Sequence, residues 1–247
     1  EDFEVCKKYP DWHLEPIGTV GPDGKYTSAV PGYEGKFALD MNVEMIKALA
    51  ASGALFAKGS LRHQYAHCWR CKNPIIYRAT EQWFSSVDGY RKKALEAIDQ
   101  VQWIPSWGHD RIYNMIRDRG DWCISRQRVW GVPIPIFYCR EHNHAIITDE
   151  TIAHLQEIFA KEGSDAWWAH TEKELLPEGF KCPECGCTEF RKESDIMDVW
   201  FDSGCTHQGV LCHDPELAYP ADMYLEGSDQ HRGWFNSSLL TSVAANG

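Results

Sequence analysis

Apolar residues recur along the chain at the spacing of amphipathic helices, interrupted by short apolar segments of another kind. Residues 42–55 (NVEMIKALAASGAL) begin with asparagine and reach Gly53 near their end, so both ends of a helix are marked. Residues 148–163 begin with a threonine followed by acids, keep helical spacing to Phe159 and stop at Gly163. Helical spacing is also found in residues 88–101, 110–118 and 234–245.

Three further apolar segments are short or carry proline, and they predict extended structure. Pro74–Tyr77 (PIIY) and Ala221–Leu225 (ADMYL) have the length of short buried strands. Residues 132–138 (VPIPIFY) carry Pro133 and Pro135, which restricts them to an edge strand or an extended connection, because proline cannot donate to a sheet. This mixture of helices and strands predicts an α/β fold with irregular insertions.

A polar turn, YLEGSDQHRGWF, lies between the last predicted strand and the last predicted helix. In an open α/β sheet the carboxyl ends of strands form the ligand crevice, and a helix N-terminus adds free N–H groups there. Glu226, Asp229 and Gln230 are therefore candidates to face a polar ligand. Gly227 and Gly233 favour this interpretation over an ordinary solvated turn, because glycine permits close backbone approach.

The chain has 247 residues, of which 43% are hydrophobic, and this composition excludes a disordered protein. Its net charge of −11 argues against general electrostatic binding of nucleic acid, although it is compatible with a local basic patch. No window approaches the roughly 20 apolar residues of a membrane span, and the opening EDFEVCKKY lacks the pattern of a secretory signal. We expect a cytosolic protein, and the glutamate at position 1 indicates an internal piece of a longer chain.

Four of the ten cysteines form C-x-x-C pairs, which favour metal ligands over disulfides in a chain without secretory signals. A closed structural zinc site needs four ligands, usually from two such turns. The segment FYCREHNH supplies a C-x-x-H pair ahead of KCPECGC, and the two together predict a zinc ribbon with a helical excursion between the turns. The alternative is a set of unliganded thiols. The predicted ligands are Cys139, His142, Cys182 and Cys185, with His144 as a spare and Cys187 as a substitute for a neighbouring cysteine.

A second metal half-site is present in HCWRC, where Cys68 and Cys71 have the same spacing. The chain offers no obvious partner pair for these two thiols. Either they bind no metal, or their partners belong to a missing N-terminal portion.

Trp200 and Trp234 stand apart among the 11 tryptophans, because each adjoins a polar turn that contains glycine. Two indoles at neighbouring strand ends could wall a pocket for an apolar side chain, although composition alone favours core packing for each. Arg126 and Arg128 could bind phosphate, and the alternative is two solvated arginines on an edge segment. The sequence has no G-x-S-x-G elbow and no G-x-x-x-x-G-K-[ST] loop, which argues against the corresponding hydrolases and P-loop enzymes.

Five segments in this order resemble the middle of a bacterial-type isoleucyl-tRNA synthetase: HCWRCKNPIIYRATEQWF, VQWIPSWG, DWCISRQRVWGVPIP, DIMDVWFDSG and YLEGSDQHRGWF. The resemblance covers essentially the whole chain. It implies part of a Rossmann-type catalytic domain with an inserted zinc ribbon and the C-terminal end of an editing domain. The implied boundaries are 1–66 for the editing domain, 67–135 for the return to the catalytic core, 136–195 for the zinc ribbon and 196–247 for the adenylate-site segment.

The resemblance also implies a reaction. A synthetase of this family activates isoleucine with ATP and Mg²⁺, transfers it to the 3′ end of tRNA(Ile), and hydrolyses mischarged valine. It is a cytoplasmic enzyme, expected to be monomeric, with Zn²⁺ as a resident metal. The H-I-G-H and K-M-S-K-S types of ATP motif do not occur in this sequence, so the resemblance implies that the chain alone is inactive.

The family's site residues carry over position by position. Glu226, Gly227, Asp229 and Gln230 match residues that line the aminoacyl-adenylate site. Trp200 and Trp234 match the indoles beside the isoleucine side chain, and Asp2 matches an aspartate of the editing pocket. The pair Cys139 and His142 departs from the C-x-x-C usual in relatives, which puts the fourth zinc ligand in doubt.

Two other functions stay open at this point. One is a valyl-tRNA synthetase, which shares the architecture but differs at the strand-end motifs. The other is a zinc-binding module that contacts RNA without catalysis, and the adenylate-site turn with its paired tryptophans argues against it.

Overall fold

The structure is a computed structural model of the chain, and it describes residues 5–6, 8–12 and 17–247. Contacts divide the chain into two compact units, residues 1–81 and 82–247, which are described separately. The expected boundary after residue 66 falls inside the first unit, and those after residues 135 and 195 fall inside the second.

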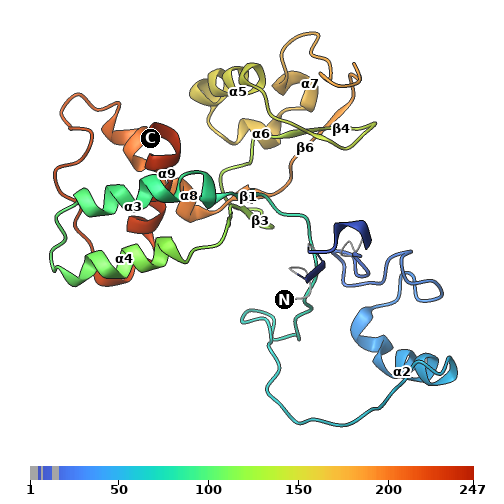
Figure 1. The fold of residues 1–247 in the computed structure, drawn as a ribbon. Coiled ribbons are helices and arrows are strands. Elements are labelled where there is room, and N and C mark those ends of the chain that lie inside the picture. Colours follow the sequence, from blue (N-terminus) through green and yellow to red (C-terminus); the bar gives the residue numbers. More distant parts are fainter. Residues whose placement is uncertain (1–4, 7, 13–16) are drawn as a thin grey trace. The chain divides into compact units, whose positions relative to one another are not determined.

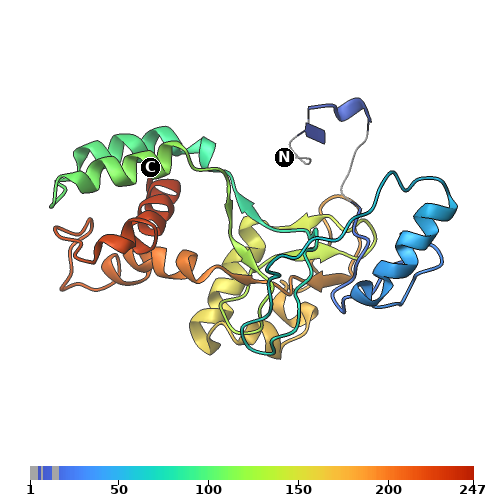
Figure 2. The same ribbon diagram turned by 90° about the horizontal axis from the view of Figure 1, so that it is seen from below.

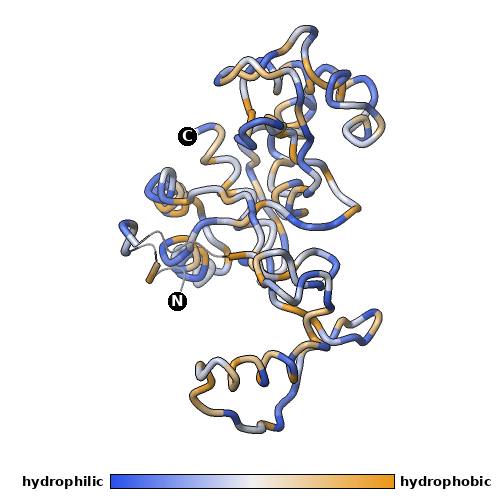
Figure 3. The backbone as a smooth tube through the Cα atoms, turned by 90° about the vertical axis from the view of Figure 1, so that its right-hand side faces the viewer, coloured by the Kyte–Doolittle hydropathy of each residue, from blue (hydrophilic) through white to orange (hydrophobic). Residues whose placement is uncertain are grey.

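The first unit contains few regular elements. It has the 3₁₀ turns η1 (Pro10–Trp12) and η2 (Ala38–Met41) and the helix α2 (Asn42–Ala51). The predicted helix at residues 42–55 is thus confirmed in its main part, and Gly53 follows it with a φ of 75°. None of the residues of α2 is buried, and hydrophobic positions run along this helix at the lower end of Figure 3.

The strand predicted at Pro74–Tyr77 is wrong. Only Pro74 makes a bridge, an isolated antiparallel one with His67, and Tyr77 is 80% exposed. A strand requires a neighbouring backbone, and proline removes one of the donors that such pairing needs.

Helices dominate one part of the second unit and pack around a shared core. The predicted helices at residues 88–101, 110–118 and 234–245 are confirmed, and Figures 1 and 2 show α3 and α4 side by side. Their core consists of Val87, Ala94, Ile98, Ile112, Ile116, Trp122, Leu240 and Val243. The elements are η3 (Val87–Gly89), α3 (Arg91–Gln100), α4 (Trp107–Arg117), α8 (Val199–Gly204), the π-helical turn η4 (His207–Leu211), η5 (Ser228–His231) and α9 (Trp234–Asn246).

A close crossing joins α8 to α9. A Cβ added at Gly204 would lie 2.9 Å from the backbone of Ser237, so only glycine allows the two helices to approach this far. The Thr241 hydroxyl donates to the carbonyl of Gly204 at 2.8 Å and fixes the crossing from the other side. The C-terminal end of α8 is therefore held against α9 at Ser237 and Thr241.

Residues 136–195 form a small module with a sheet and a hydrophobic core of their own. Its antiparallel sheet has the order β5–β4–β6, and helices lie between β5 and β6 in sequence. The core contains Phe137, Leu155, Trp167, Leu175 and Phe190 among others. The elements are β4 (Phe137–Cys139), β5 (Ala145–Ile146), α5 (Asp149–Glu162), α6 (Ala166–Ala169), α7 (Glu172–Leu175) and β6 (Phe190–Lys192).

The start and end of α5 follow the sequence signals. Thr148 caps the helix by accepting from the backbone N–H of Thr151 at 3.2 Å, and Gly163 ends it with a φ of 81°. Residues 132–136, which carry both prolines, are an extended connection, one of the two predicted forms, and Pro133 makes a bridge to Ile196. The prediction is wrong for Phe137 and Tyr138, because β4 is the central strand of its sheet. The strand itself begins only at Phe137, beyond both prolines.

The remaining strands are short pairs, β1 (Phe84–Ser85) with β2 (Trp122–Cys123) and β3 (Ser125–Arg126) with β7 (Ile196–Met197). Every strand pair among residues 5–6, 8–12 and 17–247 is antiparallel, so the parallel sheet of a Rossmann-type fold is not formed within them.

The strand predicted at Ala221–Leu225 is wrong, because this segment is irregular. Met223 is 78% exposed and Leu225 is 81% exposed, and no described segment pairs with either of them. In the part of the chain that the structure covers, no helix combines the length and the apolar character needed to cross a bilayer.

Candidate functional site

The polar turn that the sequence singled out forms η5 and leads directly into α9. Gln230 organises it, because its side-chain oxygen accepts from the backbone N–H of Trp234 at 2.9 Å and its amide donates to Asp229 at 3.2 Å. A Cβ at Gly233 would lie 2.5 Å from that oxygen and 2.9 Å from the Trp200 ring. Glycine at 233 is therefore required by close packing.

His231 anchors this turn to α4. Its imidazole is 5% exposed, and its ring centroid lies 5.8 Å from that of Trp103 and 5.6 Å from that of Trp107. A Cβ at Gly108 would lie 2.9 Å from Nε2, so this glycine makes room for the ring. The side of the turn that carries His231 is thus buried, and the opposite, polar side is exposed.

Glu226 and Asp229 lie on the open side of the turn. Both residues are exposed, and within the described residues the Glu226 carboxylate has no hydrogen bond or ion pair. A Cβ at Gly227 would lie 2.7 Å from the Asp229 carboxylate, so the backbone and this carboxylate approach closely. The four predicted adenylate-site residues are therefore neighbours on one turn, with two carboxylates available to a ligand.

The two predicted pocket tryptophans start neighbouring helices but pack differently. Trp200, in the first turn of α8, is 43% exposed and lies against Gly233. Trp234, at the start of α9, donates from Nε1 to the carbonyl of Ser203 at 2.9 Å and stacks on Tyr224 with 4.3 Å between ring centroids. The structure thus fixes both indoles beside the same polar turn, and a shared wall for an apolar side chain stays a prediction.

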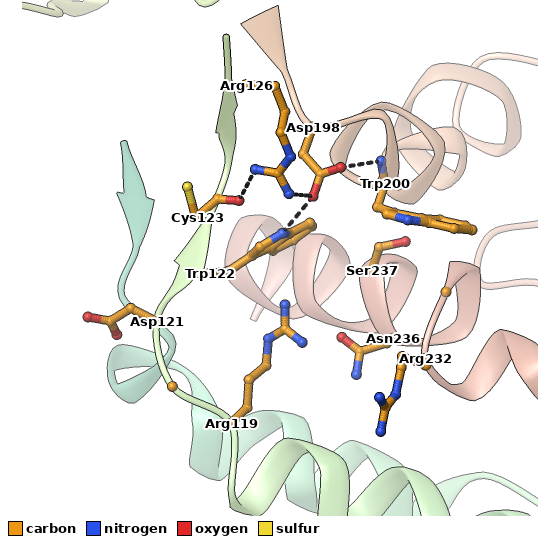
Figure 4. Close-up of a pocket in the computed structure, with 12 residues that line it drawn as sticks. Arg119, Asp121, Trp122, Cys123, Arg126, Asp198, Trp200, Arg232, Asn236 and Ser237 are labelled. Atoms are coloured by element: carbon orange, nitrogen blue, oxygen red, sulfur yellow. Dashed lines mark hydrogen bonds and ion pairs between the residues drawn. The ribbon is translucent and has the colours of Figure 1, made fainter. Parts of the chain in front are cut away.

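A cavity of about 350 Å³ opens beside Trp200. Figure 4 shows side chains from α4's C-terminal loop, β2, α8 and α9 around it. Glu226, Asp229 and Trp234 do not line it. The lining residues are Arg119, Gly120, Asp121, Trp122, Cys123, Arg126, Asp198, Trp200, Arg232, Gly233, Asn236 and Ser237.

Asp198 is the central acid of this region, and the sequence patterns did not identify it. Its side chain is 5% exposed and accepts from Trp122 Nε1 at 3.0 Å, from Arg126 Nη2 at 2.8 Å and from the backbone N–H of Trp200 at 3.1 Å (Figure 4). The last contact caps α8. An aspartate directly before a helical segment was the signal that could have revealed it.

Arg126 is occupied by this acid, which weighs against the phosphate-binding hypothesis for it. Its guanidinium also donates to the carbonyls of Cys123 and Ser125, each at 2.7 Å. Arg128 is exposed and donates to the carbonyl of Gln127 at 3.0 Å.

The predicted zinc ligands lie on two turns of identical backbone design. In the first, the N–H of Cys139 donates to the carbonyl of His144 at 3.1 Å, the N–H of Asn143 donates to the carbonyl of Cys139 at 2.8 Å, and Asn143 has a φ of 54°. In the second, the N–H of Cys182 donates to the carbonyl of Cys187 at 2.8 Å, and the N–H of Gly186 donates to the carbonyl of Cys182 at 2.8 Å. Gly186 has a φ of 74°.

The turn at Cys68 repeats the same design in the first unit. The N–H of Cys68 donates to the carbonyl of Asn73 at 2.8 Å, the N–H of Lys72 donates to the carbonyl of Cys68 at 2.9 Å, and Lys72 has a φ of 62°. A lysine in this left-handed region is uncommon, so the preference of the lysine itself does not explain the turn.

Asp2, the predicted editing residue, lies outside the described residues.

Three of the four predicted ligands converge in the module. The sulfurs of Cys139, Cys182 and Cys185 lie within 4.8 Å of one another, and those of Cys139 and Cys185 are 3.6 Å apart. Tetrahedral zinc with bonds of about 2.3 Å holds two sulfurs about 3.7 Å apart, so this spacing fits the metal. The side chains therefore form the greater part of a tetrahedral site.

The fourth position has two candidate imidazoles. Nε2 of His144 lies 3.0 Å from the sulfur of Cys182, whereas His142 groups with Cys185 and Glu141. The predicted ligand His142 and the spare His144 therefore lie near different cysteines of the thiol cluster.

The thiols influence one another's protonation. Burial disfavours the Cys139 thiolate, but the backbone N–H groups of His142 and Glu141 outweigh it and lower the pKa of Cys139. At Cys185 the backbone N–H of Cys187 favours the thiolate, yet burial and the neighbouring sulfurs raise the pKa of Cys185 to about 12. A divalent cation would supply the positive charge that lets all three thiols ionise together.

The sequence profile described as tRNA synthetases class I (I, L, M and V) matches residues 2–247. The chain is similar to proteins named isoleucine–tRNA ligase. It is 60% identical to that of Moorella thermoacetica and 63% identical to that of Desulfitobacterium hafniense, in each case over the whole chain and 26% of the relative. Identity to the protein of Carboxydothermus hydrogenoformans is 58%, over the whole chain and 27% of the relative. The chain thus spans about a quarter of the length of these relatives.

Proposed function

Because the chain belongs to the class I tRNA synthetases for isoleucine, leucine, methionine and valine, we propose that it is part of an isoleucine–tRNA ligase. The enzyme activates isoleucine with ATP and Mg²⁺ and transfers it to tRNA(Ile). The observation that carries this proposal is the identity of 57–63% to isoleucine–tRNA ligases across the whole chain. The polar turn with its two open carboxylates is the part of the described chain that suits an amino acid and a nucleotide.

The finer organisation is proposed from the same resemblance. The module of residues 136–195 serves as a zinc ribbon, the helices around α8 and α9 belong to a Rossmann-type catalytic domain, and residues 1–66 belong to an editing domain that hydrolyses mischarged valine. The enzyme is cytoplasmic, makes no contact with membranes and acts as a monomer.

We also propose Zn²⁺ as a resident metal of the module, held by Cys139, Cys182 and Cys185 with an imidazole as fourth ligand. The sulfur spacing of 3.6 Å and the two matched turns support it. In a closed site of this kind the metal supplies structural rigidity and takes no part in catalysis.

Amino-acid-dependent exchange of pyrophosphate into ATP tests the proposed function. We expect the full-length protein to catalyse this exchange with isoleucine far better than with valine, and we expect the 247-residue chain alone to show none. The reason is that the H-I-G-H and K-M-S-K-S types of motif, which place charge around the leaving pyrophosphate, do not occur in it. Preferred exchange with valine would identify a valine enzyme. No exchange with any amino acid would favour the non-catalytic RNA-contact module.

Two substitutions in the full-length protein test the assignment of the turn. Glu226→Ala removes a charged partner of the adenylate. It should lower kcat/KM for activation by a factor that corresponds to about 2 to 4 kcal/mol of transition-state free energy, for isoleucine and valine alike. Trp234→Ala opens the apolar wall, so its cost should depend on the side chain that is bound. The contrast available is small, because one methylene is worth about 1 to 3 kcal/mol, a value whose published example is this enzyme family.

We therefore expect Trp234→Ala to bring the isoleucine-to-valine ratio of kcat/KM toward one, and Glu226→Ala to leave it nearly unchanged. The measurement is pyrophosphate exchange with each amino acid in each variant. A wild-type ratio in Trp234→Ala would show that the side-chain pocket lies elsewhere.

A further inference from the structure

The cavity beside Trp200 contains more positive charge than its own acids neutralise. Arg119, Arg126 and Arg232 line it, and Asp198 is committed to Arg126 at 2.8 Å. The other lining acid, Asp121, is exposed, and Figure 4 shows its carboxylate directed away from Arg119. Within residues 82–247 the side chains of Arg119 and Arg232 make no hydrogen bond and no ion pair. Two guanidinium groups in one cavity are therefore left without a hydrogen-bond or ion-pair partner.

Arg119 is the guanidinium for which the lack of a hydrogen-bond partner is most unfavourable. Its Nε is buried and has no hydrogen-bond partner, and its guanidinium lies 5.5 Å from the centroid of the Trp122 ring. Burial lowers the pKa of Arg119, because a charged group without a partner is unfavourable away from water. An anion in the cavity would satisfy this group.

Asn236 adds a neutral donor to the same space. The residue is 4% exposed, and its side-chain amide has no hydrogen-bond partner among the described residues. Figure 4 shows the amide facing the space between Arg119 and Arg232. The amide therefore reaches the open space of the cavity, where it can donate to a polar ligand.

Two forked guanidinium groups and one amide donor match the oxygens of a phosphate group. The cavity is lined by Trp200 and Gly233, so it adjoins the turn that is proposed to hold the adenylate. The substrate that must reach the adenylate at this point is the 3′ end of an RNA. Since the chain carries a net charge of −11, an RNA strand needs local positive charge to approach it.

We propose that Arg119 and Arg232, assisted by Asn236, bind a phosphodiester of the RNA 3′-terminal strand in this cavity and so position the terminal ribose for acyl transfer. This proposal rests on the proposed function. It assigns to these residues a positioning role in the transfer step.

A double-mutant cycle in the full-length protein tests the contact. The RNA substrates are a normal transcript of the acceptor RNA and three versions in which one of the last three phosphodiesters is a neutral methylphosphonate. At one of these positions the neutral linkage should lower kcat/KM for acyl transfer about tenfold in the wild-type protein. Arg119→Met should cause a similar loss on normal RNA, and the two changes together should cost no more than either alone.

Two further variants separate charge from packing. Arg119→Lys retains the charge without the fork, so the neutral linkage should lower its kcat/KM less than in the wild-type protein but more than in Arg119→Met. If Arg119 has a merely structural role, both variants should keep the full tenfold sensitivity to the neutral linkage. Arg232→Met, on an exposed residue whose loss leaves the core intact, should repeat the result if Arg119→Met is inactive. Arg117→Met is the matched control, because Arg117 pairs with Asp118 at 2.7 Å, does not line the cavity and should keep full sensitivity.

Additive losses, about 100-fold together, at all three linkages would overturn the proposal. A raised KM for ATP in Arg119→Met, with undiminished sensitivity to every neutral linkage, would assign the phosphate to the nucleotide and also overturn it. These outcomes are distinct from failure of the proposed function, which would appear as absence of isoleucine-dependent pyrophosphate exchange in the wild-type protein.

Discussion

Replacement of Cys182 by serine is expected to remove one zinc ion per chain from the full-length protein and to unfold the module of residues 136–195. Cys182 is 2% exposed, belongs to both the thiol cluster and the hydrophobic core, and closes the second turn. Structural zinc sites contribute about 10 to 16 kcal/mol of apparent binding free energy in small domains, more than such a module could replace by packing. Elemental analysis measures the zinc, and hydrogen exchange of the amides of β4, β5 and β6 measures the unfolding.

The control is Cys212→Ser, because Cys212 is exposed and lies outside the thiol cluster. It should leave both the zinc content and the exchange rates unchanged. Full zinc content in Cys182→Ser would mean that the thiol cluster is not the site. Comparing His144→Ala with His142→Ala identifies the fourth ligand, and the Nε2 to sulfur distance of 3.0 Å favours a larger loss for His144.

Asp198→Ala should lower the free energy of local unfolding of α8 and α9 by about 3 kcal/mol. The change leaves the Trp122 N–H without its acceptor, takes the carboxylate from Arg126 Nη2, and removes the cap of α8. Breaking a buried pair costs about 3 to 5 kcal/mol, and the lower end applies because Arg126 is 42% exposed and can be solvated. Native-state hydrogen exchange in α9 should accelerate by roughly 100-fold, since each 1.4 kcal/mol is about a factor of ten.

Asp202→Asn on the same helix is the matched control. Burial, reinforced by the nearby Asp198, raises the pKa of Asp202, so the charged form is disfavoured in the folded protein. The folded-state pKa lies above the unfolded one, so any stability from Asp202 is present at low pH and lost as pH rises through the two values. At neutral pH the substitution should therefore not accelerate exchange. If Asp198→Ala behaves like this control, its three contacts contribute little.

The sequence was sufficient wherever structure depends on neighbouring residues. The helix α5 begins at Thr148 and ends at Gly163, as its capping signals predict, because such caps act within one turn. The cysteine spacing likewise predicted each of the two turns, since each is built from its own backbone hydrogen bonds. Their convergence was expected from a different argument, because a closed tetrahedral site needs ligands from both turns.

The sequence was insufficient wherever the outcome depends on distant partners. An apolar run such as Ala221–Leu225 becomes a strand only beside another strand, and none of the described segments supplies one. Arg119 and Asp198 have no motif of their own, and their importance follows from burial and from which charges face them. For the same reason Arg126 and Arg119 could not be distinguished in sequence, although only Arg126 has a carboxylate partner.

The connectivity of the module also determines the order in which it can assemble. The turn at Asn143 joins β4 directly to β5, so this hairpin and the first pair of ligands can form on the microsecond timescale of local structure. Cys182 stands 38 residues beyond His144, and closing that loop carries an entropy cost that grows with its length. Capture of the proposed metal by the first turn alone would be weak and reversible, and it would become lasting only when Cys182 and Cys185 of the second turn join the cluster. During synthesis the proposed zinc would therefore be retained only after the second turn, which closes at Cys187, has emerged.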